Sequence, residues 1–174
     1  MRVARIALVA LLAASGGAVF AATQSARGSA TVTVEGSVDK QLSLGVEDLK
    51  RYPAHDVQIN TDANRAGAPT ASPRSYKGAL LRDVMTAAKP RERKPRDLRR
   101  GYVIVSATDG YQVVFSWAEL FLSPIGKSVV VAYERDGQPI SDPEGPIVVV
   151  SGMDTGAARH VKWLQSIKFV IAGE

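Results

Sequence analysis

Four side chains suited to binding an anion or a polar heterocycle lie within five positions near the C-terminus of this 174-residue chain. They belong to the segment SGMDTGAARHVKWLQSIKFV, residues 151–170, and are Arg159, His160, Lys162 and Trp163. Arginine presents a planar fork of donors and lysine a compact positive charge, so the pair suits an anion or the carbonyl edge of a heterocycle. Tryptophan adds a flat apolar face for stacking. Gly152 and Gly156 in the preceding loop would let backbone amides approach a ligand closely.

The same cluster also fits a purely structural interpretation. Alternate side chains of an extended segment point to opposite faces, so the charges could face water while Trp163 fills the core. The residue types alone leave both interpretations open. A second motif, ATDGYQ, contains Asp109 and Tyr111. Because DG is typical of a hairpin turn and tyrosine of a strand, the residue types favour an ordinary turn there.

The composition excludes several kinds of reactive site. The chain has no cysteine, which excludes thiol nucleophiles, zinc–thiolate sites and iron–sulfur clusters. Its two histidines, His55 and His160, are far apart and have no further ligand at helical spacing, so we expect no metal site. The nucleophile motif G-x-S-x-G does not occur, and GMDTG lacks the spacing of a dinucleotide-binding or phosphate-binding loop.

Residues 1–22 have the pattern of a cleavable signal peptide. Two arginines precede an apolar run that is shorter than the about 20 residues required by a membrane-spanning helix. Val19 and Ala21 suit positions −3 and −1 of a signal-peptidase site, so we expect cleavage after Ala21 or Ala22 and a periplasmic mature protein. An uncleaved membrane anchor is the alternative.

The mature chain is expected to form one basic domain, residues 31–174, after a flexible lead-in, residues 23–30. Removing Arg2 and Arg5 leaves 20 basic and 17 acidic residues, which lowers the net charge from +5 to +3. The run KPRERKPRDLRR, residues 89–100, could touch nucleic acid or anionic lipid, but it contains two prolines and no aromatic residue for base stacking. We interpret it as a solvated connector and expect no nucleic-acid partner.

Hydrophobic patterning predicts mostly strands with two or three short helices, which is typical of an α+β domain. Strands are predicted on both sides of a TDGY turn, in residues 31–38 with an end near Gly36, and in 42–45, 55–60, 128–140 and 144–152. Residues 161–173 are predicted to form a turn or short helix followed by a terminal strand. Helices are predicted around residues 46–51, over 76–88 and after Ser116, and a long loop over 61–75. Ser116 and Glu119 have the spacing of a capping box, which predicts a helix start at Ser116.

The order of four segments resembles the molybdopterin-binding domain of the sulfite oxidase family. The segments are SYKGALLRDVM, VIVSATDGYQVVFSWAEL, VVVAYERDGQPI…EGPIVVV and GMDTGAARHVKWLQSI, and the similarity runs roughly from Val32 to Ile171. The most specific part is GAARHVKWL, which is similar to the family's G-A-R-x-V-K-W-L segment after a glycine loop. DGY and DGQPI are weaker parts, because they are common in other proteins.

The resemblance implies the sulfite oxidase-like fold, mostly β with a few short helices, and a cofactor pocket lined by loops. By analogy, the basic residues of GAARHVKWL face the pterin, Trp163 packs beside it, and Asp109 and Tyr111 lie near the rim. The residues that it places at the ligand are Asn60, Thr61, Tyr76, Asp109, Tyr111, Ser151, Arg159, His160, Lys162 and Trp163.

The chain departs from the family where the metal would be bound. The family attaches molybdenum through a cysteine thiolate, and Asn60 or Thr61 stands about where that cysteine would be. Amide and hydroxyl oxygens are hard, weak substitutes for a soft thiolate. Val148 likewise stands where the family's arginine is expected.

These features lead us to expect an exported pterin-binding protein that holds no catalytic metal. It would be similar to small periplasmic pterin-binding regulators that signal to a membrane-bound enzyme controlling cyclic-di-GMP. The first alternative is a molybdenum cofactor-dependent oxidoreductase, or a subunit of one, that binds molybdopterin without a cysteine ligand. The second alternative is an interaction module that binds no small molecule, in which the residues of the family's cofactor pocket serve only for packing.

Overall fold

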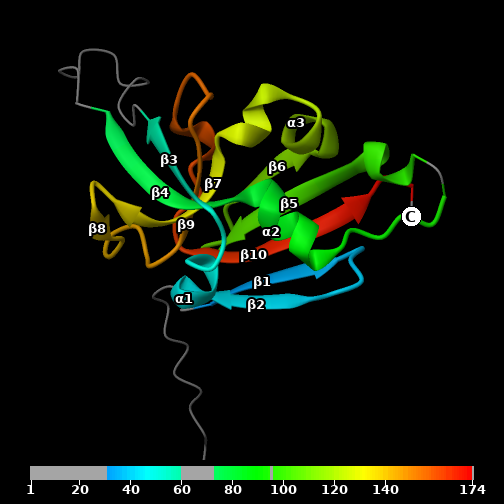
Figure 1. The fold of residues 1–174 in the computed structure, drawn as a ribbon, viewed down its shortest axis with the longest axis horizontal. Helices are drawn as coiled ribbons and strands as arrows, with labels where there is room; N and C mark the ends of the chain where they lie inside the picture. Colours follow the sequence, from blue (N-terminus) through cyan, green and yellow to red (C-terminus); the bar gives the residue numbers. More distant parts are fainter. Residues whose placement is uncertain (1–30, 60–72, 95, 174) are drawn as a thin grey trace, which may run out of the picture.

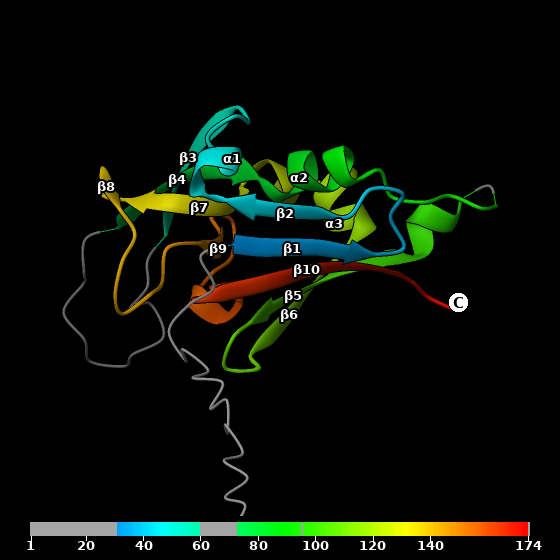
Figure 2. The ribbon, with the colours of Figure 1, turned by 90° about the horizontal axis from the view of Figure 1, so that it is seen from below.

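The computed structural model describes residues 31–59, 73–94 and 96–173, which form two packed β-sheets with short helices (Figures 1 and 2). The first sheet has the strand order β2 (Leu42–Gly45), β1 (Thr31–Gly36), β10 (Leu164–Ile171), β5 (Gly101–Ala107) and β6 (Gln112–Ser116). β1 and β10 are parallel and the other neighbours are antiparallel. The second sheet has the order β3 (Ala54–Ile59), β4 (Arg74–Leu80), β7 (Val129–Arg135) and β8 (Gln138–Pro139), and β9 (Val148–Ser151) also pairs with β7.

Strand alternation sets which side chains enter the core. Buried residues alternate with more exposed ones along β1 and along most of β5 and β10, and the buried ones, including Val34, Val105 and Ile167, form the main core. β9 is buried along its whole length, as its valine run predicts. Part of the second sheet, including Val57, Leu80 and Val150, forms a smaller apolar cluster of its own.

The helices are short and connect the strands. They are α1 (Val46–Leu49), α2 (Leu81–Ala88) and α3 (Trp117–Phe121), with 3-10 turns η1 (Asp97–Arg100), η2 (Pro124–Lys127) and η3 (Ala157–Arg159). No helix among the described residues is both long enough and apolar enough to cross a bilayer. The prediction of a mostly β domain with a few short helices is therefore confirmed.

The predicted helix over residues 76–88 is wrong in its first half, because Tyr76–Leu80 belongs to β4 and only Leu81–Ala88 is helical. β4 lies between β3 and β7 and pairs with both. At Gly78 the strands approach so closely that an added Cβ would lie 2.1 Å from the Val131 carbonyl oxygen. Sheet pairing on both sides overrides the helical spacing of the leucines, which is a local pattern.

The predicted capping box at Ser116 is confirmed. Ser116 Oγ accepts a hydrogen bond from the Glu119 backbone N–H at 3.1 Å, and Glu119 Oε2 accepts one from the Ser116 backbone N–H at 2.7 Å. We expect Ser116→Ala to lower the free energy of unfolding by about 1 kcal/mol, the usual value of a lost N-cap. Urea denaturation measures the loss. Ser43→Ala, at an exposed position of β2, is the matched control and should leave the midpoint unchanged.

Candidate functional site

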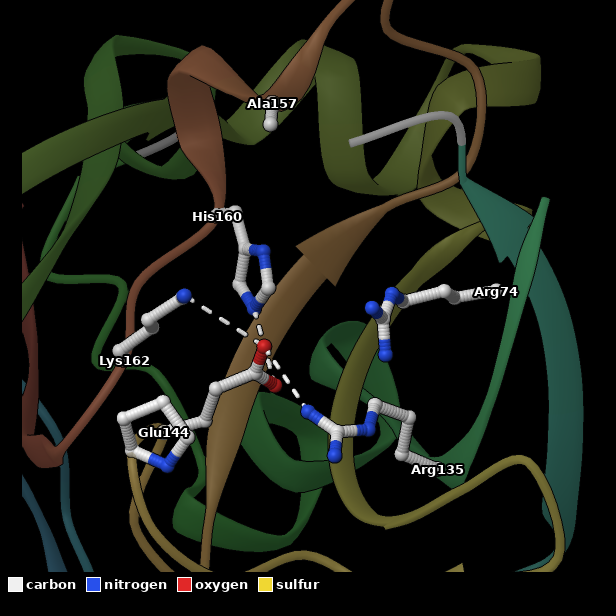
Figure 3. Close-up of a pocket in the computed structure, with 7 residues that line it drawn as sticks. Arg74, Arg135, Glu144, Ala157, His160 and Lys162 are labelled. Atoms are coloured by element: carbon white, nitrogen blue, oxygen red, sulfur yellow. Dashed lines mark ion pairs between the residues drawn. The ribbon is translucent and has the colours of Figure 1, made fainter. Parts of the chain in front are cut away.

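A cavity of about 470 Å³ lies where the ends of several elements of the second sheet meet (Figure 3). Its lining residues are Arg74, Arg135, Pro143, Glu144, Ala157, His160 and Lys162. Arg74 begins β4 and Arg135 ends β7, while Glu144 lies in the loop before β9. Because these strand ends are adjacent in the sheet, residues far apart in the chain meet around one carboxylate.

The carboxylate of Glu144 is the centre of this site. Only 5% of the residue is exposed. Arg135 Nη1 lies 3.1 Å and Lys162 Nζ 3.4 Å from Glu144 Oε1. The hydroxyl of Tyr76 donates a hydrogen bond to Glu144 Oε2 at 3.0 Å. A buried carboxylate is therefore surrounded by cations and a hydroxyl donor, as a buried charge requires.

Pairing with β9 explains why His160 and Lys162 point to the same cavity. The backbone of Val161 exchanges two hydrogen bonds of 2.9 Å with Val149 in β9, and the Val161 side chain is fully buried. The residues on either side of Val161 in this extended segment share the opposite face. His160 and Lys162 therefore lie on the face that borders Glu144.

Burial and neighbouring charges set the protonation states of Glu144 and His160. Burial raises the pKa of the Glu144 carboxyl, but His160, Lys162, the Tyr76 hydrogen bond and Arg135 together outweigh it and hold the pKa below its usual value. Burial lowers the pKa of His160 to about 4, despite the attraction of Glu144. His160 is therefore neutral at pH 7. Its Nε2 atom is buried, has no hydrogen-bond partner among the described residues and lies 3.9 Å from Glu144 Oε2.

The buried neutral histidine predicts a loss of stability in mild acid. The unfolded chain binds a proton at His160 near pH 6.5, whereas the folded protein binds that proton only near pH 4. Lowering the pH through this interval therefore favours unfolding. We expect the free energy of unfolding to fall by about 2 kcal/mol between pH 7 and pH 5. Denaturant titrations at both pH values measure this difference.

The two histidines of the chain provide a matched control for that experiment. His160→Gln should remove most of the fall, since glutamine does not titrate, whereas His55→Gln should keep it. An equal fall in all three proteins would show that His160 is not its source.

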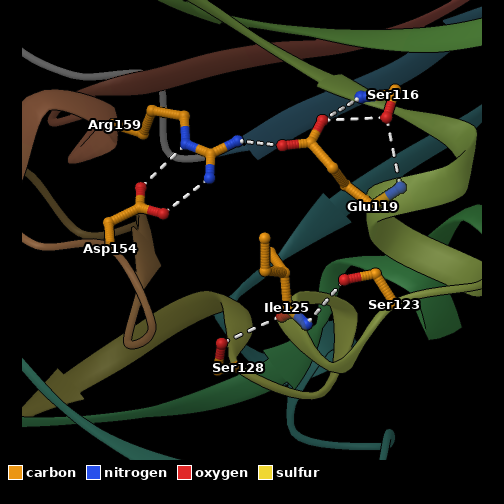
Figure 4. Close-up of polar contacts among 7 residues, drawn as sticks. All are labelled: Ser116, Glu119, Ser123, Ile125, Ser128, Asp154 and Arg159. Atoms are coloured by element: carbon orange, nitrogen blue, oxygen red, sulfur yellow. Dashed lines mark hydrogen bonds and ion pairs between the residues drawn. The ribbon is translucent and has the colours of Figure 1, made fainter.

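Arg159 is not part of the Glu144 cavity. Its Nε donates a hydrogen bond to Asp154 Oδ2 at 2.7 Å and its Nη1 donates to Glu119 Oε1 at 2.9 Å (Figure 4). The guanidinium also lies 4.4 Å from the centre of the Phe115 ring. Arg159 lowers the pKa of the Asp154 carboxyl. The side chain thus links the loop before it to α3, beside a second hollow of about 390 Å³ formed by residues 153–156, 158 and 159.

Trp163 packs against the loop that contains Glu144. Its backbone N–H donates to the Glu144 carbonyl at 2.8 Å. Its ring lies against Gly145, where an added Cβ would lie 2.6 Å from Trp163 Cε3, and Gly145 has a φ of +83°. A glycine is required there both by the backbone and by the indole. Trp163 is not among the residues that line the cavity.

The other residues expected at a ligand are spread around the site. Tyr111 donates from its hydroxyl to the Ala158 carbonyl, and its backbone N–H donates to Asp109 Oδ1 at 2.9 Å, so Asp109 stays within the hairpin turn. Ser151 is buried at the end of β9, and its Oγ has no partner among the described residues. Asn60 and Thr61 lie outside the described residues. Of the ten, the structure brings Tyr76, His160 and Lys162 together at Glu144.

Sequence reasoning missed the three other charged residues of the cavity, namely Arg74, Arg135 and Glu144. Each is an ordinary charged residue in a polar stretch, and no motif distinguishes it from neighbours that face water. The one local signal was the position of Glu144 between Pro143 and Gly145, just before a buried valine strand.

The donors at the cavity fit an anionic heterocycle better than a metal ion. No three histidine, aspartate or glutamate side chains among residues 31–59, 73–94 and 96–173 are grouped to hold a metal. Guanidinium and ammonium groups repel metal ions but bind phosphate and carbonyl oxygens. The unpartnered Nε2 of His160 and the carboxylate of Glu144 add a neutral polar atom and an anionic acceptor. The lining therefore suits a ligand that carries both hydrogen-bond donors and anionic or carbonyl acceptors.

Comparison with known families agrees with this chemistry. The model of the oxidoreductase molybdopterin binding domain matches residues 21–172. The chain belongs to this family. The family match includes the Glu144 loop, β9 and the His160–Lys162 segment, so the cavity is formed within the molybdopterin-binding domain itself. A comparison with curated protein sequences finds no match.

The molybdopterin-binding domain is also similar to a solved structure, the sulfane dehydrogenase SoxCD from Paracoccus pantotrophus. The match has a TM-score of 0.60 and 16% sequence identity, and it covers 83% of this chain. This similarity confirms the expected sulfite oxidase-like fold. The chain spans only 39% of that solved chain, so the similarity concerns one part of a longer protein.

Proposed function

We propose that this molybdopterin-binding domain is an exported protein that binds a pterin in the Glu144 cavity and holds no catalytic metal. The observation that supports this most strongly is the composition of the cavity. It combines one buried, ionised carboxylate with three cationic side chains, Arg74, Arg135 and Lys162. These groups complement the two polar ends of a pterin.

The carboxylate would recognise the pyrimidine edge of the pterin. The 2-amino group and the adjacent ring N–H form a pair of donors, and a carboxylate accepts two such donors side by side. Glu144 remains ionised at neutral pH because its pKa is lowered, so it can act only as an acceptor.

The cations would bind the acceptor groups of the same ligand. Arg135 and Lys162 neutralise Glu144, and Arg74 adds a further positive charge, although its Nη1 also lies 3.9 Å from Asp136 Oδ2. The lining thus keeps an excess of positive charge for a ring carbonyl or a phosphate. A volume of about 470 Å³ is within the range of small-molecule sites.

The missing cysteine favours binding over catalysis. A molybdenum centre of this family is attached through a thiolate, and the chain has no cysteine anywhere. Export through residues 1–22 and signalling to a membrane-bound enzyme that controls cyclic-di-GMP complete the proposal. These two parts rest on the signal-peptide pattern and on the resemblance to small periplasmic regulators.

Purification of the full chain with its own leader tests the proposal. We expect periplasmic protein that lacks residues 1–22, that co-purifies with a pterin identified by absorbance and mass, and that binds added pterins at micromolar concentrations by fluorescence quenching. Lys162→Gln should weaken binding about tenfold by loss of a charge-assisted contact. Lys168→Gln, an exposed lysine on β10, is the matched control.

Two outcomes would contradict the proposal. The first is no quenching and no thermal shift with any pterin at high micromolar concentration. The second is stoichiometric molybdenum in the natively expressed protein, which would support the alternative function suggested by the family, a molybdenum cofactor-dependent oxidoreductase.

A further inference from the structure

The positive charge of the chain is concentrated in one short segment. Residues 89–100 contain seven of the 22 basic residues and two of the 17 acidic residues, so the other 162 residues contain 15 of each. The net charge of +5 therefore equals the excess within this segment. We call its basic side chains the basic end; they are Lys89, Arg91, Arg93, Lys94, Arg96, Arg99 and Arg100.

The basic end lies at one extremity of the molecule. It follows α2, includes η1 and leads into β5, beside the end of β10 (Figures 1 and 2). In the view of Figure 1 it lies to the right, whereas β8 and the strand ends around the Glu144 cavity lie to the left. None of its residues lines that cavity.

Internal hydrogen bonds hold this segment in one conformation. Arg91 Nε donates to Asp39 Oδ1 at 2.9 Å, and Arg100 Nη2 donates to Asp97 Oδ1 at 2.6 Å. Asp97 is 3% exposed and also accepts from the Lys94 backbone N–H at 2.6 Å. Glu92 accepts from the Arg96 backbone N–H at 2.8 Å. Both acidic residues are thus used within the loop, while Lys89, Lys94, Arg96 and Arg99 are exposed.

The chemistry of this surface indicates which kind of partner it fits. A protein interface usually has an apolar centre with a polar rim. The basic end shows no such centre in the part of the chain that the structure describes, where the large exposed apolar residues, Tyr111, Val114, Leu122 and Met153, lie in other segments. Binding of single-stranded nucleic acid depends on aromatic residues for stacking, and the basic end has none. Diffuse attraction to a layer of anionic headgroups requires only exposed cations.

We propose that the basic end binds the surface of a bilayer that contains anionic phosphatidylglycerol headgroups. The protein would then lie with the Glu144 cavity directed away from the lipid. This goes beyond our interpretation of residues 89–100 as a solvated connector, since the segment also carries the net charge of the chain. The charge and exposure of the basic end do not depend on what the Glu144 cavity binds.

Sedimentation with lipid vesicles tests this inference on the mature protein. We expect binding to vesicles of phosphatidylglycerol and phosphatidylcholine at 50 mM salt, none to pure phosphatidylcholine, and loss of binding at 500 mM salt, because salt screens exposed charges. The triple variant Lys94→Gln, Arg96→Gln, Arg99→Gln should bind at least tenfold more weakly. Lys50→Gln, Arg51→Gln, Lys127→Gln removes the same charge from exposed residues elsewhere and should bind like the wild type.

Three results would overturn the inference. One is wild-type binding that does not distinguish the two kinds of vesicle. Another is an equal loss in both triple variants, which would mean that net charge matters rather than this surface. The third is salt-sensitive binding to an acidic peptide or to single-stranded DNA without binding to vesicles. Circular dichroism of both variants confirms that they are folded, and pterin binding in the same samples is measured separately.

Discussion

Replacement of Glu144 by Gln is expected to weaken pterin binding ten- to a hundredfold, the range of a lost hydrogen bond to a charged group, about 1.5–3 kcal/mol. Glutamine has the same shape, and its oxygen can still accept from the Tyr76 hydroxyl. Its amide group, however, presents donors where the pyrimidine edge of a pterin also presents donors. Arg135 and Lys162 would in addition lose the carboxylate that holds them 3.1 and 3.4 Å from it. Isothermal titration with a pterin measures the change.

The control for this experiment is Glu134→Gln. Glu134 lies in the same strand as Arg135, and its carboxylate is 3.8 Å from Lys77 rather than in the cavity. We expect this variant to bind pterin like the wild type. If Glu144→Gln binds pterin as tightly as the wild type while both variants remain folded, Glu144 does not contact the ligand.

Gly78→Ala is expected to lower the free energy of unfolding by about 4 kcal/mol or more, at the upper end of single substitutions. A Cβ at Gly78 would lie 2.1 Å from the Val131 carbonyl oxygen and 2.5 Å from Ala132 Cα, and both are backbone atoms. β4 and β7 would have to separate in the middle of a buried sheet. Because Arg74 and Tyr76 lie on β4, the Glu144 cavity should lose its shape as well. Thermal melting followed by circular dichroism measures the loss.

Gly137→Ala separates this steric effect from the backbone freedom of glycine. Gly137 has a φ of +76°, and an added Cβ there meets no atom within 4 Å. This variant should lose only about 1 kcal/mol, the conformational cost of alanine in the left-handed region. Similar losses for the two variants would show that the contact between β4 and β7 is not the cause.

The elements that depend on residues close together in the sequence were predictable. The valine run of β9, the strands around the TDGY turn and the capping box at Ser116 lie where their patterns indicate. The resemblance of GAARHVKWL also indicated the family, and the match over residues 21–172 confirms it. In each case the residues that make up the pattern lie within a few positions of one another in the sequence.

The sequence by itself determined the alternation of the strands, the helix start at Ser116, the family and the absence of a thiolate ligand. Tertiary structure alone decided that Tyr76–Leu80 is a strand, that Arg159 turns towards Asp154 and Glu119, and that Glu144 gathers the cations. The reason is the distance in sequence between the residues that make these contacts. Tyr76 and Glu144 are 68 positions apart and Arg159 and Glu119 are 40 apart, so no local propensity encodes these contacts. They form because strand pairing brings the strand ends together. A charge buried there is stable only when an opposite charge or a hydrogen-bond donor compensates it.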